Sequence, residues 1–368
     1  MKKQLKMFAA ALCACVMAFT LAACNSPDPG PDPTSLSTLK LLNNVDGYGM
    51  YSMDYLEDYK FDEFLETGAA DDDALATFLS EVLLDGMDVE IKAPGIGCST
   101  FSGELKDSGD QIFARNFDFS FAPSLVVTTT PANGYKSIST VNLGFIGYTK
   151  TNLPNLEDEE HLLPILVAPY IPLDGINEKG LAIGVLQLNW LSAKQNDPDK
   201  INLPTTTMIR MILDKAATVD EAVDLMKEYN IRDSLGANFH YQIADKTGRS
   251  VVVEYLNNHG NIQMHIIEKK AGQDYHFATN FYLNENAASV TGMPNGLKHT
   301  STCTRYATMK TVLAANSGIF ANEMEAMLLL RDVRQNSTWW SVVYNLEKLT
   351  VTFVPARQYY MPPYLFAI

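Results

Sequence analysis

Histidine and cysteine are scarce in this sequence of 368 residues, which has six histidines and five cysteines. The histidines show no H-x-x-x-H or similar spacing, and the three cysteines from position 24 onward lie far apart in the chain. Closely spaced histidines and cysteines are the usual signature of a zinc site. We therefore expect neither a bound metal ion nor another cofactor.

Basic clusters and long apolar runs are also missing from most of the chain. There are 28 Lys and Arg against 43 Asp and Glu, and beyond the first six residues the positive charges are not gathered in any stretch. A nucleic-acid partner is not expected, because such proteins carry a basic patch. After residue 24 no apolar run approaches the roughly 20 residues that a membrane helix needs.

The first 23 residues have the features of an export signal. Three lysines precede an apolar run over residues 7–21, which at 15 residues is too short to span a bilayer well. The run ends in Leu-Ala-Ala-Cys, which resembles a bacterial lipobox, so we predict cleavage before Cys24 and lipidation of that cysteine. A plain secretory signal is the alternative. The prediction is an exported lipoprotein, at the cell surface or in the periplasm, whose only membrane contact is this anchor.

Three further segments follow the signal. Residues 24–40 are rich in Pro, Ser and Asp and have no periodicity, which indicates a tether. Residues 41–97 carry 14 Asp and Glu against two Lys, and apolar steps of three and four residues over 74–83 predict a small helical pro-region. Residues 98–368 contain blocks of predicted strands and helices. These blocks indicate an α+β catalytic domain of stacked layers, with sheets inside and helices outside.

The stretch Gly-Ile-Gly-Cys-Ser-Thr-Phe over residues 95–101 holds the candidate nucleophile. We interpret Cys98 as a residue that becomes an N-terminus when its bond to Gly97 is cut. A free α-amine has a pKa of about 7.7–8.0 and can act as a general base, so one residue supplies both thiolate and base. Two alternatives stay open: Cys98 is a small buried core residue, or it forms a disulfide with Cys303.

Six motifs occur in a fixed order from Cys98 onward. They are Cys-Ser-Thr-Phe at 98–101, Arg-Asn-Phe-Asp at 115–118, Asp-Gly-Ile-Asn-Glu-Lys-Gly-Leu at 174–181, a long block at 239–254, Thr-Asn at 279–280 and Thr-Arg-Tyr at 304–306. Together they resemble the choloylglycine hydrolase family of linear amide hydrolases, which includes bile salt hydrolases and penicillin V acylases. The similarity covers about residues 98–354. It implies a four-layer αββα Ntn-hydrolase sandwich of antiparallel sheets.

The resemblance also implies a set of catalytic residues around Cys98. Arg115 would lower the pKa of the thiol, because a neighbouring guanidinium favours the thiolate. Asp118 would accept a hydrogen bond from the α-amine, and Asn280 would donate one to the oxyanion. Arg305 corresponds to an arginine that the family keeps near the nucleophile. Without the resemblance, the two arginines are typical surface charges, and Asp118 and Asn280 are typical turn residues.

Gln187 departs from the family pattern. It occupies the second oxyanion position, where other members carry Asn or Tyr, and Asn189 follows on the same face of the predicted strand. The sequence leaves open which of the two completes the oxyanion hole, and whether a side chain or the backbone donates. A lone histidine on a strand, such as His240, is interpreted as a structural residue.

The predicted function is hydrolysis of a linear amide bond in a small N-acyl substrate, through a thioester on Cys98. Candidate substrates are a conjugated bile salt, penicillin V or an N-acyl amino acid. The alternatives are acyl transfer on the same fold, or a non-catalytic binding lipoprotein. Autocleavage after Gly97 is a hypothesis; it would release the lipid with the pro-region unless the helix over 74–83 stays packed. A homo-oligomer is compatible with the sequence, but only 24 residues separate Asn280 from Arg305, so a tetramer is not expected.

Overall fold

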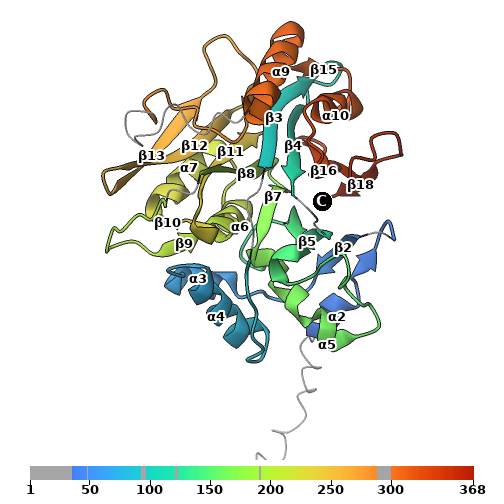
Figure 1. The fold of residues 1–368 in the computed structure, drawn as a ribbon, viewed down its shortest axis with the longest axis vertical. Coiled ribbons are helices and arrows are strands. Elements are labelled where there is room, and N and C mark those ends of the chain that lie inside the picture. The colour runs from blue at the N-terminus through green and yellow to red at the C-terminus, as the bar shows by residue number, and fades with distance from the viewer. Residues whose placement is uncertain are drawn as a thin grey trace, which may run out of the picture.

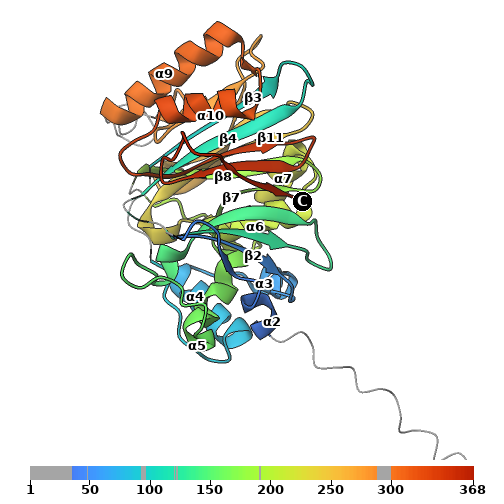
Figure 2. The same cartoon turned by 90° about the vertical axis from the view of Figure 1, so that its right-hand side faces the viewer.

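Two large β-sheets are stacked in the middle of the molecule, and helices cover the outer face of each (Figure 1, Figure 2). The structure is a computed structural model that describes residues 35–47, 49–92, 97–119, 121, 123–189, 192–287 and 300–368. A sheet with two apolar faces must be covered on both sides, and this requirement produces the layers. The predicted α+β fold of four layers is confirmed.

The larger sheet has nine strands within the described residues. In spatial order they are β1 (Asn43–Asn44), β2 (Met50–Tyr55), β5 (Ser124–Thr129), β6 (Ser137–Asn142), β7 (Pro172–Asn177), β8 (Leu181–Asn189), β11 (Asn238–Asp245), β12 (Ser250–Asn258) and β13 (Asn261–Glu268). Neighbouring strands are antiparallel except β2 and β5, which run parallel. The apolar run of β12 is buried on both faces, whereas β13 at the edge alternates between exposed and half-buried residues.

The smaller sheet carries the candidate nucleophile. Its main path is β14 (His276–Ala278), β3 (Gly97–Leu105), β4 (Gln111–Asp118), β16 (Thr338–Asn345), β17 (Thr350–Pro355) and β18 (Tyr364–Ala367). The short strand β15 (Ile319–Phe320) joins β3 in parallel. A separate parallel pair is formed by β9 (Asn202–Pro204) and β10 (Asn230–Arg232). Strand β3 packs across the layer boundary against β8 and β11.

The helices divide between the two outer faces. On the larger sheet α6 (Thr205–Lys215) packs against β7 and β8, with α7 (Val219–Glu228) beside it. On the smaller sheet α10 (Glu323–Asp332) packs against β4 and β16, and α9 (Thr300–Asn316) contacts β14. The shorter elements are α2 (Ser35–Leu39), α5 (Glu159–Leu162) and the 3₁₀ turns η1 (Leu143–Ile146), η2 (Leu163–Tyr170) and η3 (Ser234–Gly236). One apolar cluster fills the space between the sheets and below the larger one, and a second lies under α9 and α10.

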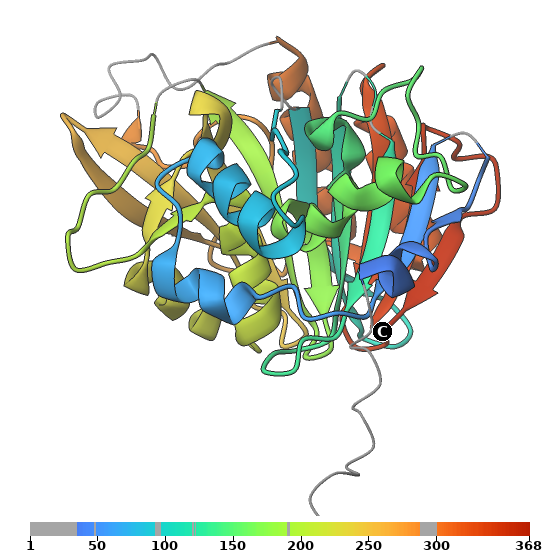
Figure 3. The same cartoon turned by 90° about the horizontal axis from the view of Figure 1, so that it is seen from below.

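The predicted pro-region is only partly helical. Helices α3 (Phe61–Thr67) and α4 (Asp72–Leu83) are present, and the Asp71 side chain caps α4 by accepting a hydrogen bond from the Ala74 amide at 2.9 Å. The expectation of helix is wrong for β1 and β2. Strand β2 alternates buried and less buried residues and finds its hydrogen-bond partner in β5, far away in the sequence. Figure 3 shows α3 and α4 covering the larger sheet from below.

Candidate active site

Cys98 is the second residue of β3, and Arg115 lies on the neighbouring strand β4. In the antiparallel register Cys98 is opposite Phe117 and Thr100 is opposite Arg115, so the thiol and the guanidinium lie on the same face of the sheet. Cys98 is fully buried, and its Sγ accepts a hydrogen bond from Nη2 of Arg115 at 3.2 Å. The structure thus brings these two predicted site residues into direct contact.

The Arg115 side chain is held from the opposite sheet. Its guanidinium forms a fully buried ion pair with Asp174 and donates to the carbonyl oxygens of Leu173 at 2.5 Å and Val185 at 2.7 Å. A buried charge requires such pairing. Gly184 makes room for the arginine, since a Cβ there would lie 3.2 Å from Cδ of Arg115. Asp174 was not predicted to act at the site, although it begins the motif at 174–181.

The pKa of the Cys98 thiol is raised above its ordinary value, with burial as the largest cause. The charges of Arg115 and Arg305 act in the opposite direction, and Asp118 adds to the increase. Arg115 therefore acts on the pKa of the thiol in the predicted direction, but burial outweighs it. The pKa of Arg305 is lowered by burial, which its anionic neighbours only partly offset.

Asp118 lies opposite Gly97 in the register of β3 and β4 and is nearly fully buried. Its carboxylate accepts hydrogen bonds from Oγ1 of Thr338 at 2.5 Å and Nε2 of Gln335 at 2.6 Å. The Cys98 main-chain nitrogen instead donates to Oδ1 of Asn280, at 2.8 Å. While Cys98 is still joined to Gly97, its amide thus donates to Asn280. The contact between Asp118 and the free α-amine of Cys98 stays a prediction.

Asn280 and Arg305 both contact Cys98. Arg305 donates to the Cys98 carbonyl oxygen, to Oγ of Ser99 at 2.6 Å and to Oδ1 of Asn280 at 2.9 Å. Its Nη1 is 3.7 Å from Oδ2 of Asp118. The surface-charge alternative for Arg305 is therefore wrong, since the residue is 5% exposed.

Gln187 meets Asn280 through its backbone. Nδ2 of Asn280 donates to the Gln187 carbonyl oxygen at 2.8 Å. Asn189 ends β8, but its side chain lies outside the described residues, so the choice between the two positions is not decided. Cys24, the predicted lipidation site, also lies outside the described residues.

His240 is buried in the way expected of a structural histidine. Its Nε2 is 2.9 Å from the Thr279 carbonyl oxygen, and its Nδ1 is 3.2 Å from Oε1 of Glu254. Glu254 in turn accepts the Leu283 amide at 2.6 Å. The pair therefore holds the turn that carries Asn280. Sequence reasoning missed Glu254, although it ends the motif at 239–254.

The remaining alternatives for the cysteines can now be compared with the structure. Cys98 and Cys303 are both free thiols, one buried and the other half-buried, so the considered disulfide is not formed. Within the described residues no group of three or more His, Cys, Asp or Glu side chains is arranged to hold a metal ion. No helix in that part of the chain is long and apolar enough to cross a bilayer.

Comparison with known proteins points to the same family as the motifs. Residues 98–278 match the model of the linear amide C–N hydrolases, choloylglycine hydrolase family. Over those residues this chain is similar to the choloylglycine hydrolase family. A bile salt hydrolase/transferase from Clostridium perfringens is 25% identical over 226 residues, which is 54% of this chain and 65% of that protein. A penicillin V acylase from Pectobacterium atrosepticum is 33% identical over 94 residues, 23% of this chain and 25% of that protein. The alignments thus span less than two thirds of either relative.

Solved structures of the family are also similar to this chain. A mutant conjugated bile acid hydrolase from Clostridium perfringens aligns with a TM-score of 0.48 at 17% identity, over 74% of this chain and 92% of that one. A penicillin V acylase from Agrobacterium tumefaciens aligns with a TM-score of 0.47 at 19% identity, over 73% and 85% of the two chains.

Proposed function

We propose that this protein is an N-terminal-nucleophile cysteine amidase that hydrolyses a linear amide bond through a thioester on Cys98. The observation that carries the proposal is the double contact of Cys98. Its thiol accepts a hydrogen bond from the buried Arg115, and its nitrogen donates to Asn280. Once Gly97 is removed, that nitrogen is an amine in the same residue as the thiol, where it can serve as the general base.

The proposed reaction has two steps. The α-amine takes the thiol proton, Sγ bonds to the carbonyl carbon of the amide, and the ammonium group returns the proton to the departing amine as the carbon–nitrogen bond breaks. A thioester then remains on Cys98. Water, deprotonated by the same amine, attacks the thioester and releases the carboxylic acid and the free thiol. Neither step needs a cofactor.

Asn280 is the proposed oxyanion donor. Its Oδ1 is fixed by Cys98 and Arg305, so Nδ2 faces the Gln187 carbonyl oxygen. An amide nitrogen has two hydrogens, so Nδ2 can keep this bond and offer the second hydrogen to the oxyanion. Gln187 then positions the donor through its backbone. Loss of one such donor typically lowers kcat by about 10²–10³-fold.

Cleavage of the Gly97–Cys98 bond is proposed to be autocatalytic. The Cys98 thiol attacks the Gly97 carbonyl carbon, and the acyl group moves from nitrogen to sulfur, which frees the Cys98 amine. Water then hydrolyses the thioester, which frees the thiol and leaves a carboxylate on Gly97. The lack of a side chain at Gly97 favours the close approach, since a Cβ there would lie 2.9 Å from Nε2 of Gln335 and 3.0 Å from Cβ of Asp118. An intact Gly97–Cys98 bond in the active protein would contradict this step.

The proposed substrates follow the two named relatives: a conjugated bile salt, penicillin V, or another N-acyl amino acid. The deciding experiment incubates processed protein with a panel of glycine- and taurine-conjugated bile acids, penicillin V and N-acyl amino acids, and measures release of the free amine. Processing is checked on the same sample by intact mass. A processed chain that releases no amine from any member would contradict the proposed amidase, and an unlabelled Cys98 after iodoacetamide would favour a binding protein.

Acyl transfer is the second candidate, because one relative is named a hydrolase/transferase. A transferase opens the thioester with an amine in place of water. Adding hydroxylamine to the reaction distinguishes the two: a transferase forms the hydroxamate in preference to the acid, and a hydrolase continues to form the acid.

The proposed location is the outer surface of the cell or the periplasm, with the chain anchored by lipid on Cys24. Metabolic labelling with a fatty-acid analogue, compared between the natural chain and Cys24→Ala, tests this anchor.

A further inference from the structure

We propose that residues 35–92 remain bound after cleavage as a permanent second subunit of the mature enzyme, and are not discarded as a pro-peptide. This inference rests on the proposed cut between Gly97 and Cys98. It concerns what the segment does once its covalent link to the catalytic chain is gone. The structure offers three independent kinds of contact between the two parts.

The first contact is made by β2, which with β1 completes one end of the larger sheet. Strand β2 pairs with β5 along its whole length, in parallel register from Met50 opposite Ser124 to Tyr55 opposite Thr129. Four of the six β2 residues are buried. Without β2, the backbone groups of β5 on that side would lose their partners and expose a sheet edge. The segment is thus part of the sheet that carries β7 and β8.

The second contact is an aromatic cluster built across the boundary. Tyr170 of η2 packs edge-on against Phe61 and Phe64, both with ring centroids at 5.4 Å, and lies 6.4 Å from the ring of Tyr59. All four residues are at most 3% exposed. Separation of the segment would bring these rings into water, and buried aromatic rings dominate the stability of obligate interfaces.

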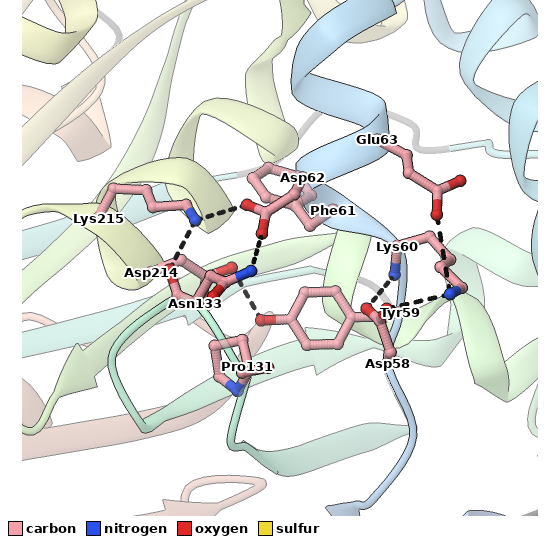
Figure 4. Close-up of a pocket in the computed structure, with 11 residues that line it drawn as sticks. Asp58, Tyr59, Lys60, Phe61, Asp62, Glu63, Pro131, Asn133, Asp214 and Lys215 are labelled. Atoms are coloured by element: carbon pink, nitrogen blue, oxygen red, sulfur yellow. Dashed lines mark hydrogen bonds and ion pairs between the residues drawn. The ribbon is translucent and has the colours of Figure 1, made fainter. Parts of the chain in front are cut away.

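The third contact is polar and is shown in Figure 4. The Tyr59 hydroxyl points to Asp214 and donates to its Oδ2 at 2.8 Å. Outside that view, the Tyr170 hydroxyl donates to the Tyr59 carbonyl oxygen at 2.7 Å. Asp214 is also 2.7 Å from Nη2 of the fully buried Arg210. At the rim, Lys215 donates to Asp62 at 2.5 Å. Removal of Tyr59 would leave the buried Asp214–Arg210 pair with one fewer partner, which is costly for buried charges.

The segment also supports the active site. Ile91 and Asp72 line a small apolar pocket together with Leu173 and Val185. The carbonyl oxygens of these last two residues hold the Arg115 guanidinium that contacts Cys98. We therefore expect that loss of the segment would disturb the strands that position Arg115, so the mature enzyme needs it for activity. It also follows that a lipid on Cys24 would keep the catalytic chain at the membrane after processing.

The test separates retention from self-cleavage. A recognition sequence for a site-specific protease is inserted between Lys92 and Gly97 in the full-length chain carrying Cys98→Ala, which cannot cut itself. After digestion, the expected result is one species in size-exclusion chromatography that contains both fragments, which separate only in denaturant. Elution of the larger fragment alone, still folded, would overturn the inference. The natural chain is examined by intact mass in parallel, and an uncut Gly97–Cys98 bond there would contradict the processing step without affecting the nicked-chain result.

Matched variants of the nicked chain locate the interaction. Tyr59→Ala, which removes both the ring contacts and the bond to Asp214, is expected to cause loss of the small fragment during chromatography. Leu56→Ala lies in the same segment on a residue that is 55% exposed, and should retain it fully. Because Tyr59→Ala could fail to fold, Tyr59→Phe is included, and it should lower the urea concentration at which the fragments separate. Equal retention in all three variants would show that this contact does not hold the fragments together.

Discussion

Cys98 lies between two guanidinium groups that contact different parts of it. Arg115 contacts the sulfur, and Arg305 contacts the carbonyl oxygen and the Asn280 side chain. The first arginine favours the thiolate form of Cys98. The second holds the Cys98 carbonyl group and the Asn280 side-chain amide, which accepts a hydrogen bond from the Cys98 nitrogen. The two residues are therefore not interchangeable, although each carries the same charge within a buried site.

Replacement of the nucleophile tests the residue that the proposed chemistry requires. Cys98→Ala should reduce amide hydrolysis by roughly 10³-fold or more, because no other group forms the thioester. The matched control is Cys303→Ala, which removes the other free cysteine of the described chain and should leave the rate unchanged. Amine release and the unfolding midpoint are measured for both. Comparable rates in Cys98→Ala and the natural chain would exclude the mechanism.

Substitution of the residue before the nucleophile tests the processing step. Gly97→Ala places a methyl group within 2.9 Å of Nε2 of Gln335 and 3.0 Å of Cβ of Asp118. We expect uncut precursor to accumulate, because the methyl group displaces the Gln335 amide from the Asp118 carboxylate. Intact mass spectrometry over a time course gives the cut fraction. In the double variant with Gln335→Ala the crowding is partly relieved, and slower processing of the double than of the single variant would contradict this explanation.

At the scale of the elements, the register between neighbouring strands decides which side chains meet at the site. Strands β3 and β4 place Cys98 and Arg115 on one face, while β7 and β8 of the other sheet supply the acceptors for the arginine. The turn after β14 carries Asn280, and the His240–Glu254 pair holds that turn from β11 and β12. Each of these proposed catalytic groups is therefore positioned by at least two strands. A substitution that weakens the pairing of β14 with β3 should lower the free energy of unfolding more than it changes the surroundings of the Cys98 thiol.

The buried His276 of β14 makes the stability of this strand depend on pH. Burial lowers its pKa from 6.5 to about 4, and the charges of Lys269 and His240 act in the same direction. Between these two values the unfolded chain binds a proton that the folded chain does not, so stability is lost as pH falls from 6.5 toward 4. The loss from this residue is about 3 kcal/mol at most.

His276→Phe is expected to remove most of that pH dependence. Urea unfolding of both proteins at pH 7.5 and pH 4.5 gives the difference in the free energy of unfolding between the two conditions. This difference should be smaller in the variant by about 2 kcal/mol. An identical loss in the natural and variant chains would mean that His276 takes up its proton equally in the folded and unfolded states.

For the whole molecule, the catalytic region and the preceding segment share one sheet and one core. Buried residues of α3 and α4 belong to the same apolar cluster as Cys98 and Phe117. The proposed cut before Cys98 would therefore break the chain without dividing its packed core. The segment resembles half of an obligate interface more than a removable cover.

A truncated chain should accordingly fail to fold alone. Residues 98–368 produced without the preceding segment are expected to be insoluble, because β5 and Tyr170 lose their partners. Production of residues 35–97 in the same cells as a separate chain should restore soluble protein. The soluble fraction and the elution volume are the measurements. A soluble truncated chain with the same unfolding temperature as the full-length protein would contradict the shared core.

The order of the motifs and most of the strands could be predicted from the sequence because their signals are local. Alternation of buried residues, turn residues and short motifs need only a few neighbouring positions to be visible. The α+β layers follow from such signals, whereas the contact between Cys98 and Arg115 was expected from the family resemblance. The capping aspartate of α4 is another example, since the group it binds is three residues away.

The partners of these residues come from distant parts of the chain and leave no local signal. Asn280 accepts a hydrogen bond from the Cys98 nitrogen, 182 positions away in the sequence, and Gln335 donates one to Asp118, 217 positions away. Strand β2 lies in an acidic segment next to helices, and only its pairing with β5 makes it a strand of the sheet. Backbone hydrogen bonds and buried charges are satisfied by whichever group the folded chain brings near. For that reason the Arg115–Asp174 pair, the surroundings of Asp118 and the place of residues 35–92 became visible only when the strands were assembled in space.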